Sequence, residues 1–322
     1  MHSKGQTLDY PPIEKSTCAA VVSSYNPPEG LIARIRDLLE QFLIVVLVDD
    51  GSVGDGNILR ECARAGAITV ESADNAGIAA ALNRGVREIG IREPAAAYVV
   101  TFDQDSSPPA GLLERYRVAL DAAVGDGLRV GMVCPGTIDE SPIPFETRDR
   151  DYLEVFEPIQ SGTLIPLRIL EQIGGFDESL FIDGVDTDAY WRLRTAGYTA
   201  IAAPGVALEH TLGSRSAAAL FGHEFRLNGE SLLIMQSAAF RYYYLVRNRC
   251  VLVRRYWYRY PAAMARGAFL DLRHLAVVLV LGSGKRTRMA FALKGLVHGI
   301  RGVGGRLDAP QGSDHEGRTT DE

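Results

Sequence analysis

Short apolar segments alternate with helical patterns through the first 105 residues of the chain. The apolar segments occupy residues 18–23, 44–48, 67–71 and 97–102. After the first of them, Leu31, Ile35 and Leu38 recur at the spacing of one helix face. Buried strands that alternate with amphipathic helices predict an α/β fold. We therefore expect a Rossmann-like, mostly parallel sheet with helices on both faces.

Polar clusters follow three of these predicted strands, at the point where each strand ends. They are Ser24-Tyr25-Asn26, Asp49-Asp50-Gly51-Ser52 and Asp103-Gln104-Asp105. Ligands of parallel α/β sheets bind beyond the carboxyl ends of the strands. The convergence of these clusters at one edge is the main functional signal in the sequence.

The acids in two of these clusters suggest different chemistry. Asp103 and Asp105 are two residues apart and can share a divalent cation, since carboxylate oxygens suit Mg²⁺ or Mn²⁺. Asp49 or Asp50 can accept a hydrogen bond from a base or a ribose. In both places a solvated turn at the end of a strand would use the same residue types.

A helix is predicted to begin near Asn75-Ala76-Gly77, with Asn83 farther along it. Gly77 would allow a close backbone approach, and free amides at a helix start attract phosphate. The alternative is a capped helix with Asn83 on its polar side.

The second half of the chain has a less regular pattern. Residues 135–158 are rich in proline and charge and predict a loop. Asp183 precedes a predicted helix over residues 186–196 and Asp186 begins it, a position where a carboxylate can act as a general base or as a helix cap. His210 is a candidate metal ligand or phosphate partner, or else a structural histidine.

Charge divides the chain into an acidic body and a basic C-terminal segment. The net charge is −15 over residues 1–240, +13 over residues 241–306 and −4 over the remainder. We expect a flexible N-terminus over residues 1–17 and a catalytic domain over 18–240. A basic, aromatic-rich helical segment over 241–301 and a disordered tail over 302–322 would follow.

The basic segment is expected to bind an anionic membrane surface. Its tyrosines and tryptophan suit the headgroup level, and no apolar run reaches the 18 or so residues that span a bilayer. The alternatives are packing on the body, a homo-oligomer contact, and nucleic-acid binding, which we rank below the membrane role. The absence of a signal peptide and four widely spaced cysteines indicate a cytoplasmic protein, peripheral on the inner face of the cell membrane.

Several of these motifs together resemble the family-2 glycosyltransferases of GT-A fold. The shared pieces, spread over residues 18–215, are residues 22–28, Val48-Asp49-Asp50-Gly51-Ser52, residues 75–79, residues 101–105, Gly174-Gly175-Phe176-Asp177-Glu178 and residues 185–188 with Trp191-Arg192. Within the family, residues 102–106 and 181–186 are most similar to bacterial rhamnosyltransferases. Residues 241–249, with Arg247-Asn248-Arg249, are similar to the C-terminal part of that group.

The resemblance implies an inverting transfer of L-rhamnose from dTDP-L-rhamnose to a lipid-linked or polysaccharide acceptor in cell-envelope glycan synthesis. It implies that Asp50, with Asp49, contacts the pyrimidine base, and that Asp103 and Asp105 bind the metal. It implies that Asp186 is the base. Many members carry Glu-Asp where this chain has Val185-Asp186, so Asp183 stays the alternative base. The residues expected to contact the nucleotide sugar are Asp49, Asp50, Asn75, Gly77, Asn83 and Asp103, with His210 a further candidate metal ligand.

Other functions fit the sequence less well. A glycoside hydrolase would use its acids as a pair flanking the bond. A nucleotidyltransferase would carry a glycine-rich phosphate loop with a basic residue, which Pro27-Pro28-Glu29-Gly30 does not supply. A family-2 enzyme that uses a UDP-sugar and a noncatalytic glycan-binding or scaffold protein remain alternatives.

Overall fold

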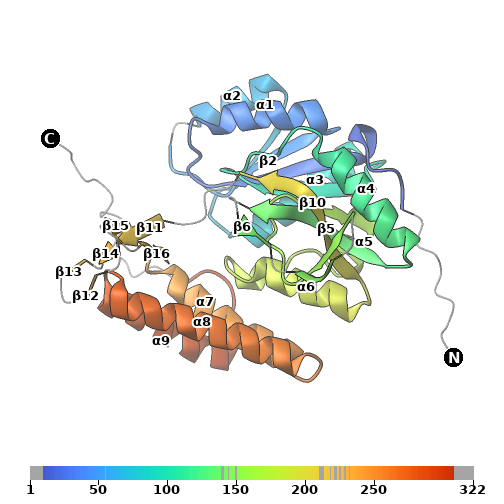
Figure 1. The fold of residues 1–322 in the computed structure, drawn as a ribbon. Coiled ribbons are helices and arrows are strands. Elements are labelled where there is room, and N and C mark those ends of the chain that lie inside the picture. Colours follow the sequence, from blue (N-terminus) through green and yellow to red (C-terminus); the bar gives the residue numbers. More distant parts are fainter. Residues whose placement is uncertain are drawn as a thin grey trace.

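The computed structural model describes residues 10–54, 56–138, 141–143, 145–148, 151–209, 214–217, 219–220, 223–224, 226–227, 230–231 and 233–307. A large twisted sheet forms the centre of the body, and three long helices lie beside it (Figure 1). The body and the helices meet along one side of the sheet domain. That junction carries much of the candidate site.

The first four strands are parallel, as the sequence predicts. They are β1 (Cys18–Ser24), β2 (Val45–Asp49), β3 (Ile68–Glu71) and β4 (Tyr98–Asp103), in the order β3-β2-β1-β4. The sheet continues through β9 (Thr163–Pro166), β5 (Val130–Ile138) and β10 (Thr199–Leu208). β9 runs antiparallel to both of its neighbours, so the sheet is parallel in its first half and mixed in its second.

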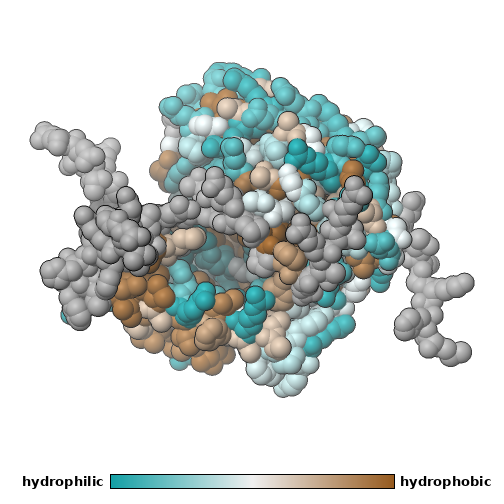
Figure 2. Space-filling view, in the orientation of Figure 1, coloured by the Kyte–Doolittle hydropathy of each residue, from teal (hydrophilic) through white to brown (hydrophobic). Residues whose placement is uncertain are grey.

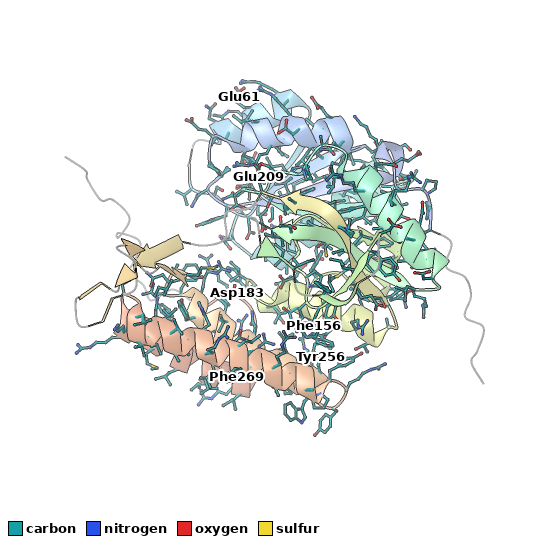
Figure 3. The ribbon with its side chains drawn as sticks, in the orientation of Figure 1. Glu61, Phe156, Asp183, Glu209, Tyr256 and Phe269 are labelled. Carbon is teal, nitrogen blue, oxygen red and sulfur yellow. The ribbon has the colours of Figure 1, made fainter. Side chains whose placement is uncertain are left out.

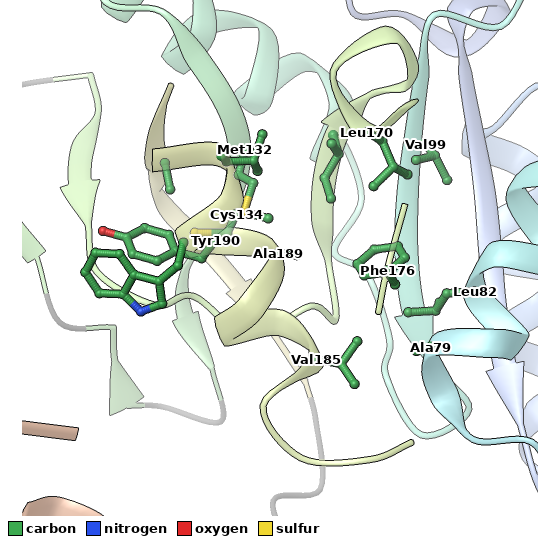
Figure 4. Packing of buried hydrophobic residues seen from close by; sticks show 14 of the residues in the cluster. Ala79, Leu82, Val99, Met132, Cys134, Leu170, Phe176, Val185, Ala189 and Tyr190 are labelled. Carbon is green, nitrogen blue, oxygen red and sulfur yellow. The ribbon is translucent and has the colours of Figure 1, made fainter. Parts of the chain in front are cut away.

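Helices cover both faces of the sheet, because alternate residues of each strand point to opposite sides. One face carries α1 (Leu31–Gln41), α2 (Asn57–Ala65) and α4 (Leu112–Gly125). The other carries α3 (Ile78–Arg92), α5 (Leu167–Gln172) and α6 (Val185–Thr195). Each face has its own hydrophobic core. Val22 belongs to the first core, under α1, α2 and α4, and Val21 belongs to the second core, under α3, α5 and α6. Figure 4 shows the second core, where Phe176 and Leu82 pack together and Val185 lies at the start of α6.

Residues 135–158 are not only a loop, which corrects the sequence prediction. Short strands form here: β8 (Leu153–Val155) and β7 (Phe145–Arg148) extend one edge of the sheet beyond β10, and β6 (Ser141–Pro142) pairs with the end of β5. Edge strands are short and tolerate proline and charge, so their sequence lacks an apolar signal. Two short 3₁₀ helices, η1 (Lys15–Thr17) and η2 (Glu178–Leu180), complete the body.

Along the chain, small pairs of antiparallel strands come between β10 and the C-terminal helices. β11 (Ser214–Ala217) pairs with β16 (Leu233–Gln236). β12 (Ala219–Leu220) pairs with β13 (His223–Glu224), and β14 (Arg226–Leu227) with β15 (Glu230–Ser231).

The C-terminal helices are α7 (Arg241–Tyr256), α8 (Pro261–Leu281) and α9 (Lys285–Arg301). α7 packs closely along α9, and its buried face includes Tyr242, Tyr243, Tyr244, Arg247 and Asn248. None of the helices in the described ranges is long and apolar enough to cross a membrane.

Both ends of the described chain are more ordered than the sequence suggests. Tyr10 donates a hydrogen bond to the Val130 carbonyl at 2.8 Å, and Ile13 is buried. After α9, the Gly305 amide donates to the Ser179 carbonyl at 2.6 Å. The expected flexible N-terminus is therefore fixed from Tyr10 onward, and the expected disordered tail is fixed through residue 307. Both segments are held by contacts with residues that are far away in the sequence.

Candidate active site

The carboxyl ends of β1, β2 and β4 form the floor of the site. In the sheet register, Ser24 of β1 pairs with Asp49 of β2, and Ser23 pairs with Asp103 of β4. Neighbouring strands lie about 4.8 Å apart, so these residues form one polar row. The three clusters that the sequence predicts at one edge therefore do meet there.

Asp49 organises the turn that follows β2. It accepts hydrogen bonds from the Ser52 amide at 2.9 Å and from the Ser24 hydroxyl at 3.3 Å, and also from the Ser52 hydroxyl. The Asn26 amide in turn donates to the Ser52 hydroxyl at 2.6 Å. Asp49 thus ties the loops after β1 and β2 together.

Asp50 holds the start of α3. Its two carboxylate oxygens accept hydrogen bonds from the Ala76 amide at 2.9 Å and the Gly77 amide at 2.7 Å. Burial raises the pKa of Asp50, although these two amides act against the shift. The amides expected to attract phosphate are therefore occupied by Asp50, which corrects that expectation.

Gly77 is required by its surroundings. Its φ is +94°, and a side-chain carbon there would meet the Phe181 carbonyl and lie 2.8 Å from the Phe181 Cα. The next amide, that of Ile78, donates to the same carbonyl at 2.9 Å. α3 therefore begins directly against the loop that carries Asp183.

The two predicted asparagines have different environments. Asn83 exchanges hydrogen bonds with the backbone of Phe176 at 2.8 and 2.9 Å and donates to the Glu178 side chain at 2.9 Å. These contacts fix Asn83 against the loop before α6, and its predicted contact with the donor stays a prediction. The side-chain oxygen of Asn75 is buried, and no donor in the described part of the chain satisfies it. A ligand could satisfy that oxygen.

Asp103 ends β4 and is held by the segment before β9. Its carboxylate accepts a hydrogen bond from Gln160 at 2.5 Å, and its amide donates to the Ser161 hydroxyl at 3.1 Å. Asp105 lies two residues farther along the same loop. These oxygen donors fit a Mg²⁺ ion, which proteins usually hold by one or two carboxylates together with substrate phosphates.

His210 lies outside the described residues, so its predicted metal role stays a prediction. Within the described ranges, no group of three or more histidine, cysteine or acidic side chains could hold a metal by itself. A cation at Asp103 and Asp105 would therefore need further ligands from the substrate or from elsewhere in the chain.

Asp183 is held in an ion pair across the junction with the C-terminal helices. Both of its carboxylate oxygens accept hydrogen bonds from Arg241, at the start of α7. Figure 3 shows Asp183 where the sheet domain faces these helices, and Figure 2 shows a hydrophilic hollow in that region. The sequence placed Arg241 in a separate segment, whereas the structure makes it part of the site.

Asp186 lies in the first turn of α6 and has a different environment. Its carboxylate accepts a hydrogen bond from the Thr187 amide at 2.8 Å, and no ion pair to it is formed within the described residues. Burial raises its pKa, and the charge of Asp183 raises it further. A half-buried carboxylate with a raised pKa is suited to accept a proton.

Arg241 links the acids of the sheet edge with those before α6. Burial alone would lower its pKa, but the ion pair with Asp183 outweighs burial and raises it. The charges of Asp103 and Asp186 raise the pKa of Arg241 as well. One guanidinium thus contacts Asp183 and is influenced by the charges of two further carboxylates, one of them from a distant part of the sequence.

Asp188 does not share this environment, although it lies close to Asp186 in the sequence. It is fully buried and forms ion pairs with Arg192 at 2.7 Å and Arg255 at 2.8 Å. The Tyr256 hydroxyl donates to it at 2.8 Å. Asp188 therefore joins α6 to α7 and has a structural role.

Four residues of the site were not predicted individually as site residues. They are Gln160, Arg241, Arg247 and Asn248. For the three residues of α7, the similarity of residues 241–249 to the rhamnosyltransferases was a signal that this segment contributes to the site. The charge of the segment pointed the other way, to a separate part of the chain.

Comparisons with known proteins agree with this geometry. Residues 19–133 match the model of the family described as glycosyl transferase family 2. The chain is 28% identical over 317 residues to "dTDP-rhamnosyl transferase RfbF" of Shigella flexneri, an alignment that covers 91% of this chain and 99% of that protein.

Solved structures share the fold. A structure of GalNAc-T7 with UDP, GalNAc and Mn²⁺ matches with a TM-score of 0.55 and 13% identity, over 88% of this chain and 56% of that longer chain. A structure of S. aureus TarS residues 1–349 matches with a TM-score of 0.50 and 14% identity, over 88% of this chain and 80% of that chain. The predicted fold class is confirmed.

Proposed function

Because this chain carries a family-2 glycosyltransferase domain of GT-A fold, we propose that it is an inverting transferase acting from a nucleoside-diphosphate sugar. The observation that carries the proposal is the polar row that Asp49 and Asp103 form at the carboxyl ends of parallel strands. The ion pair between Asp183 and Arg241 lies in the same electrostatic environment, since the charges of Asp103 and Asp186 both act on Arg241. These observations support a site that joins a diphosphate and metal region at β4 to a basic carboxylate at α6.

The reaction would be a single displacement. Asp186 accepts the proton of the acceptor hydroxyl while the oxygen forms a bond to the anomeric carbon. The bond from that carbon to the diphosphate breaks, and its electron pair leaves with the nucleoside diphosphate. Attack from the opposite face inverts the anomeric centre.

Other side chains would bind and orient the donor. Asp49, Asp50 and Asn75 lie at the ends of the first strands, where a nucleoside would bind. Asp103 and Asp105 would hold Mg²⁺ or Mn²⁺, which when bound stabilises the charge of the leaving diphosphate. We assign Asp186 as the base in preference to Asp183, because Asp183 is engaged by Arg241.

We propose dTDP-L-rhamnose as the donor and a lipid-linked or polysaccharide acceptor of the cell envelope. The similarity to the Shigella dTDP-rhamnosyl transferase, which extends over nearly its whole length, supports this donor. The test is a panel of dTDP-L-rhamnose and several UDP-sugars, with binding followed by calorimetry and turnover by release of the nucleoside diphosphate. Preference for a UDP-sugar would change the donor, and failure to bind or turn over any nucleotide sugar would refute the enzyme.

We further propose that α8 and α9 place the enzyme on an anionic membrane surface. Exposed apolar residues run along both helices: Phe269, Leu272, Val277 and Val280 on α8, and Met289, Leu293, Val297 and Ile300 on α9. The hydrophobic surface over α8 is visible in Figure 2. Exposed Arg273, Arg286 and Lys294 lie on the same two helices, an arrangement that suits anionic headgroups.

A further inference from the structure

The loop from Ser179 to Gly184 leads directly to the proposed base and has an unusual backbone. Phe181 has a φ of +64° and Asp183 a φ of +63°, and both are non-glycine residues. Such conformations are costly for non-glycine residues and persist only where the surroundings enforce them. The loop is therefore held in place by its neighbours.

Two buried polar residues of α7, Arg247 and Asn248, make most of the hydrogen bonds that hold the loop. Arg247 donates to the carbonyls of Ser179 at 3.1 Å and Leu180 at 2.7 Å. Asn248 donates to three carbonyls of the loop. Its acceptors are the carbonyls of Leu180, Ile182 and Asp183, at 3.0, 2.8 and 2.5 Å.

Arg247 and Asn248 also hold each other. The Arg247 Nε donates to the Asn248 side-chain oxygen at 2.8 Å, which orients the amide so that its NH₂ group faces the loop. Both side chains are almost completely buried, at 0% and 1% exposure. No acidic side chain among the described residues pairs with Arg247, so its charge is balanced by carbonyl oxygens and by the rings of Tyr243 and Tyr244.

The opposite side of the loop is fixed by α3. The Ile78 amide donates to the Phe181 carbonyl, and the Phe181 ring stacks on Tyr244 of α7 at 4.9 Å between ring centroids. The loop is thus enclosed between the start of α3, which Asp50 holds, and the buried face of α7. Burying an arginine and an asparagine is costly unless their hydrogen bonds are satisfied, and here the loop satisfies most of them.

We propose that Arg247 and Asn248 are positioning residues, which act through the loop of residues 179–184 to place Asp183 and Asp186 in the site. α7 is then part of the catalytic domain. This inference rests on the proposed transferase function, because it concerns the geometry of the proposed base. Neither side chain needs to touch the substrate.

The test compares three variants of the full chain. Asn248→Ala removes the donors to three carbonyls. Arg247→Lys retains the charge and the aliphatic stem but loses the forked geometry, and it is expected to fold even where a larger truncation does not. The matched control is Arg249→Ala on the same helix, where the ion pair to Asp271 of α8 is lost and the loop is untouched.

Two measurements are made on each variant. In hydrogen–deuterium exchange, amides of residues 179–186 should exchange about tenfold faster in Asn248→Ala, with a smaller increase in Arg247→Lys. With the donor identified by the panel, kcat of Asn248→Ala should fall about 100-fold, the effect of a displacement of about 1 Å, while the donor KM stays within about threefold. Arg247→Lys should retain more of kcat, and Arg249→Ala should match the wild type in both measurements.

A merely structural role predicts a different result. It would lower the melting temperature in all three variants without a selective effect on the loop or on kcat. Wild-type loop exchange in a folded Asn248→Ala variant would overturn the inference, and so would faster exchange with unchanged kcat. If the wild type turns over no donor, the proposed function fails, and the exchange data alone then decide whether α7 holds the loop.

Discussion

Asp183 and Asp186 are three positions apart in the sequence, yet their environments differ. Asp183 has a bidentate partner in Arg241, whereas Asp186 accepts a hydrogen bond from the Thr187 amide and forms no ion pair among the described residues. Both oxygens of Asp183 are occupied by the guanidinium, so they are less accessible to an acceptor hydroxyl. The structure thereby favours Asp186, between two candidates that the sequence left open.

Replacing the base should abolish turnover without affecting donor binding. We expect Asp186→Asn to lose at least about 100-fold in kcat, the usual contribution of a positioned base. Donor affinity, measured by calorimetry, should not change. Asp183→Asn should retain more activity, since it removes a partner of Arg241 and not the proton acceptor. An inactive Asp183→Asn beside an active Asp186→Asn would move the assignment to Asp183.

The raised pKa of Asp186 should be visible in the pH dependence of kcat. Asp186 must be ionised to accept a proton, so activity falls as the pH drops through its pKa. Burial and the charge of Asp183 raise that pKa, with Glu157 and Arg241 the other charged groups nearby. The acid limb should therefore lie above the ordinary aspartate value of about 3.9.

The variant Asp183→Asn checks the cause of that shift. It removes a negative charge and leaves Arg241 unpaired, and both changes favour the ionised form of Asp186. The acid limb should move to lower pH in this variant. A limb at the same pH as in the wild type would show that another group titrates.

We expect the metal dependence of transfer to rest on Asp103 and Asp105. Asp103→Ala and Asp105→Ala should abolish transfer while circular dichroism shows an intact fold, because both residues lie at the surface end of a strand. EDTA should inactivate the wild type, and Mg²⁺ or Mn²⁺ should restore it. Asp37→Ala, on the exposed face of α1, is the matched control. Full activity of both variants in chelator would exclude the metal role.

At the scale of elements, α7 is fixed between the body and α9 by close backbone contact. Gly295 of α9 lies against the Tyr243 carbonyl, and Gly299 lies against the Arg247 carbonyl. Larger side chains at either position would separate the two helices. Because α7 holds the loop before α6, packing between α7 and α9 also supports the site.

Adding one methyl group should show the importance of this contact. Gly295→Ala places a carbon against the Tyr243 carbonyl and should lower the free energy of unfolding by about 1–3 kcal/mol. The same change at Gly90 of α3, where nothing lies within 4 Å, should raise it by up to about 1 kcal/mol through helix propensity. Urea denaturation measures both. Equal effects at the two positions would show that α7 and α9 are not tightly packed.

At the scale of the whole molecule, the basic segment divides into two groups of cations. Arg241, Arg247, Arg249, Arg255 and Arg288 contact the protein itself. Arg255 is therefore not a candidate for lipid binding, although it belongs to the basic cluster of the sequence. Arg273, Arg286 and Lys294 are exposed beside the apolar residues of α8 and α9. From the sequence we expected the basic segment either to bind a membrane or to pack on the body. The first group of cations packs on the protein, and the second group is the one that we propose for membrane contact.

Vesicle sedimentation tests the membrane surface. Binding should require anionic lipid and weaken as salt rises, since each basic side chain contributes about 1 kcal/mol that salt screens. Replacing Arg273, Arg286 and Lys294 with alanine should abolish most of it. Replacing Arg36, Arg60 and Arg64, exposed on α1 and α2, is the matched control. Equal recovery with neutral vesicles, or a salt-independent dimer in size-exclusion chromatography, would reject the lipid surface.

Much of the fold and half of the site could be predicted from local sequence. Strands β1, β2 and β4 are continuous apolar runs, and each ends where a polar cluster begins. The strand order was not predicted, because the chain passes from β3 over two strands before β4 pairs with β1. The short strands between 141 and 155 could not be predicted either, because they pair through tertiary contacts and carry no apolar run.

By itself, the sequence determined that acids of separate strands would meet at one edge, because parallel strands present their carboxyl ends together. It also determined which residue types are available there. Only the tertiary structure decided how each is used. It paired Asp183 with Arg241, placed Asp186 without an ion pair among the described residues, and gave Asp50 to the amides of α3. It also joined α7 to the loop of residues 179–184 through Arg247 and Asn248. These pairings join residues 26 to 68 positions apart, a separation at which local pattern carries no information about contact.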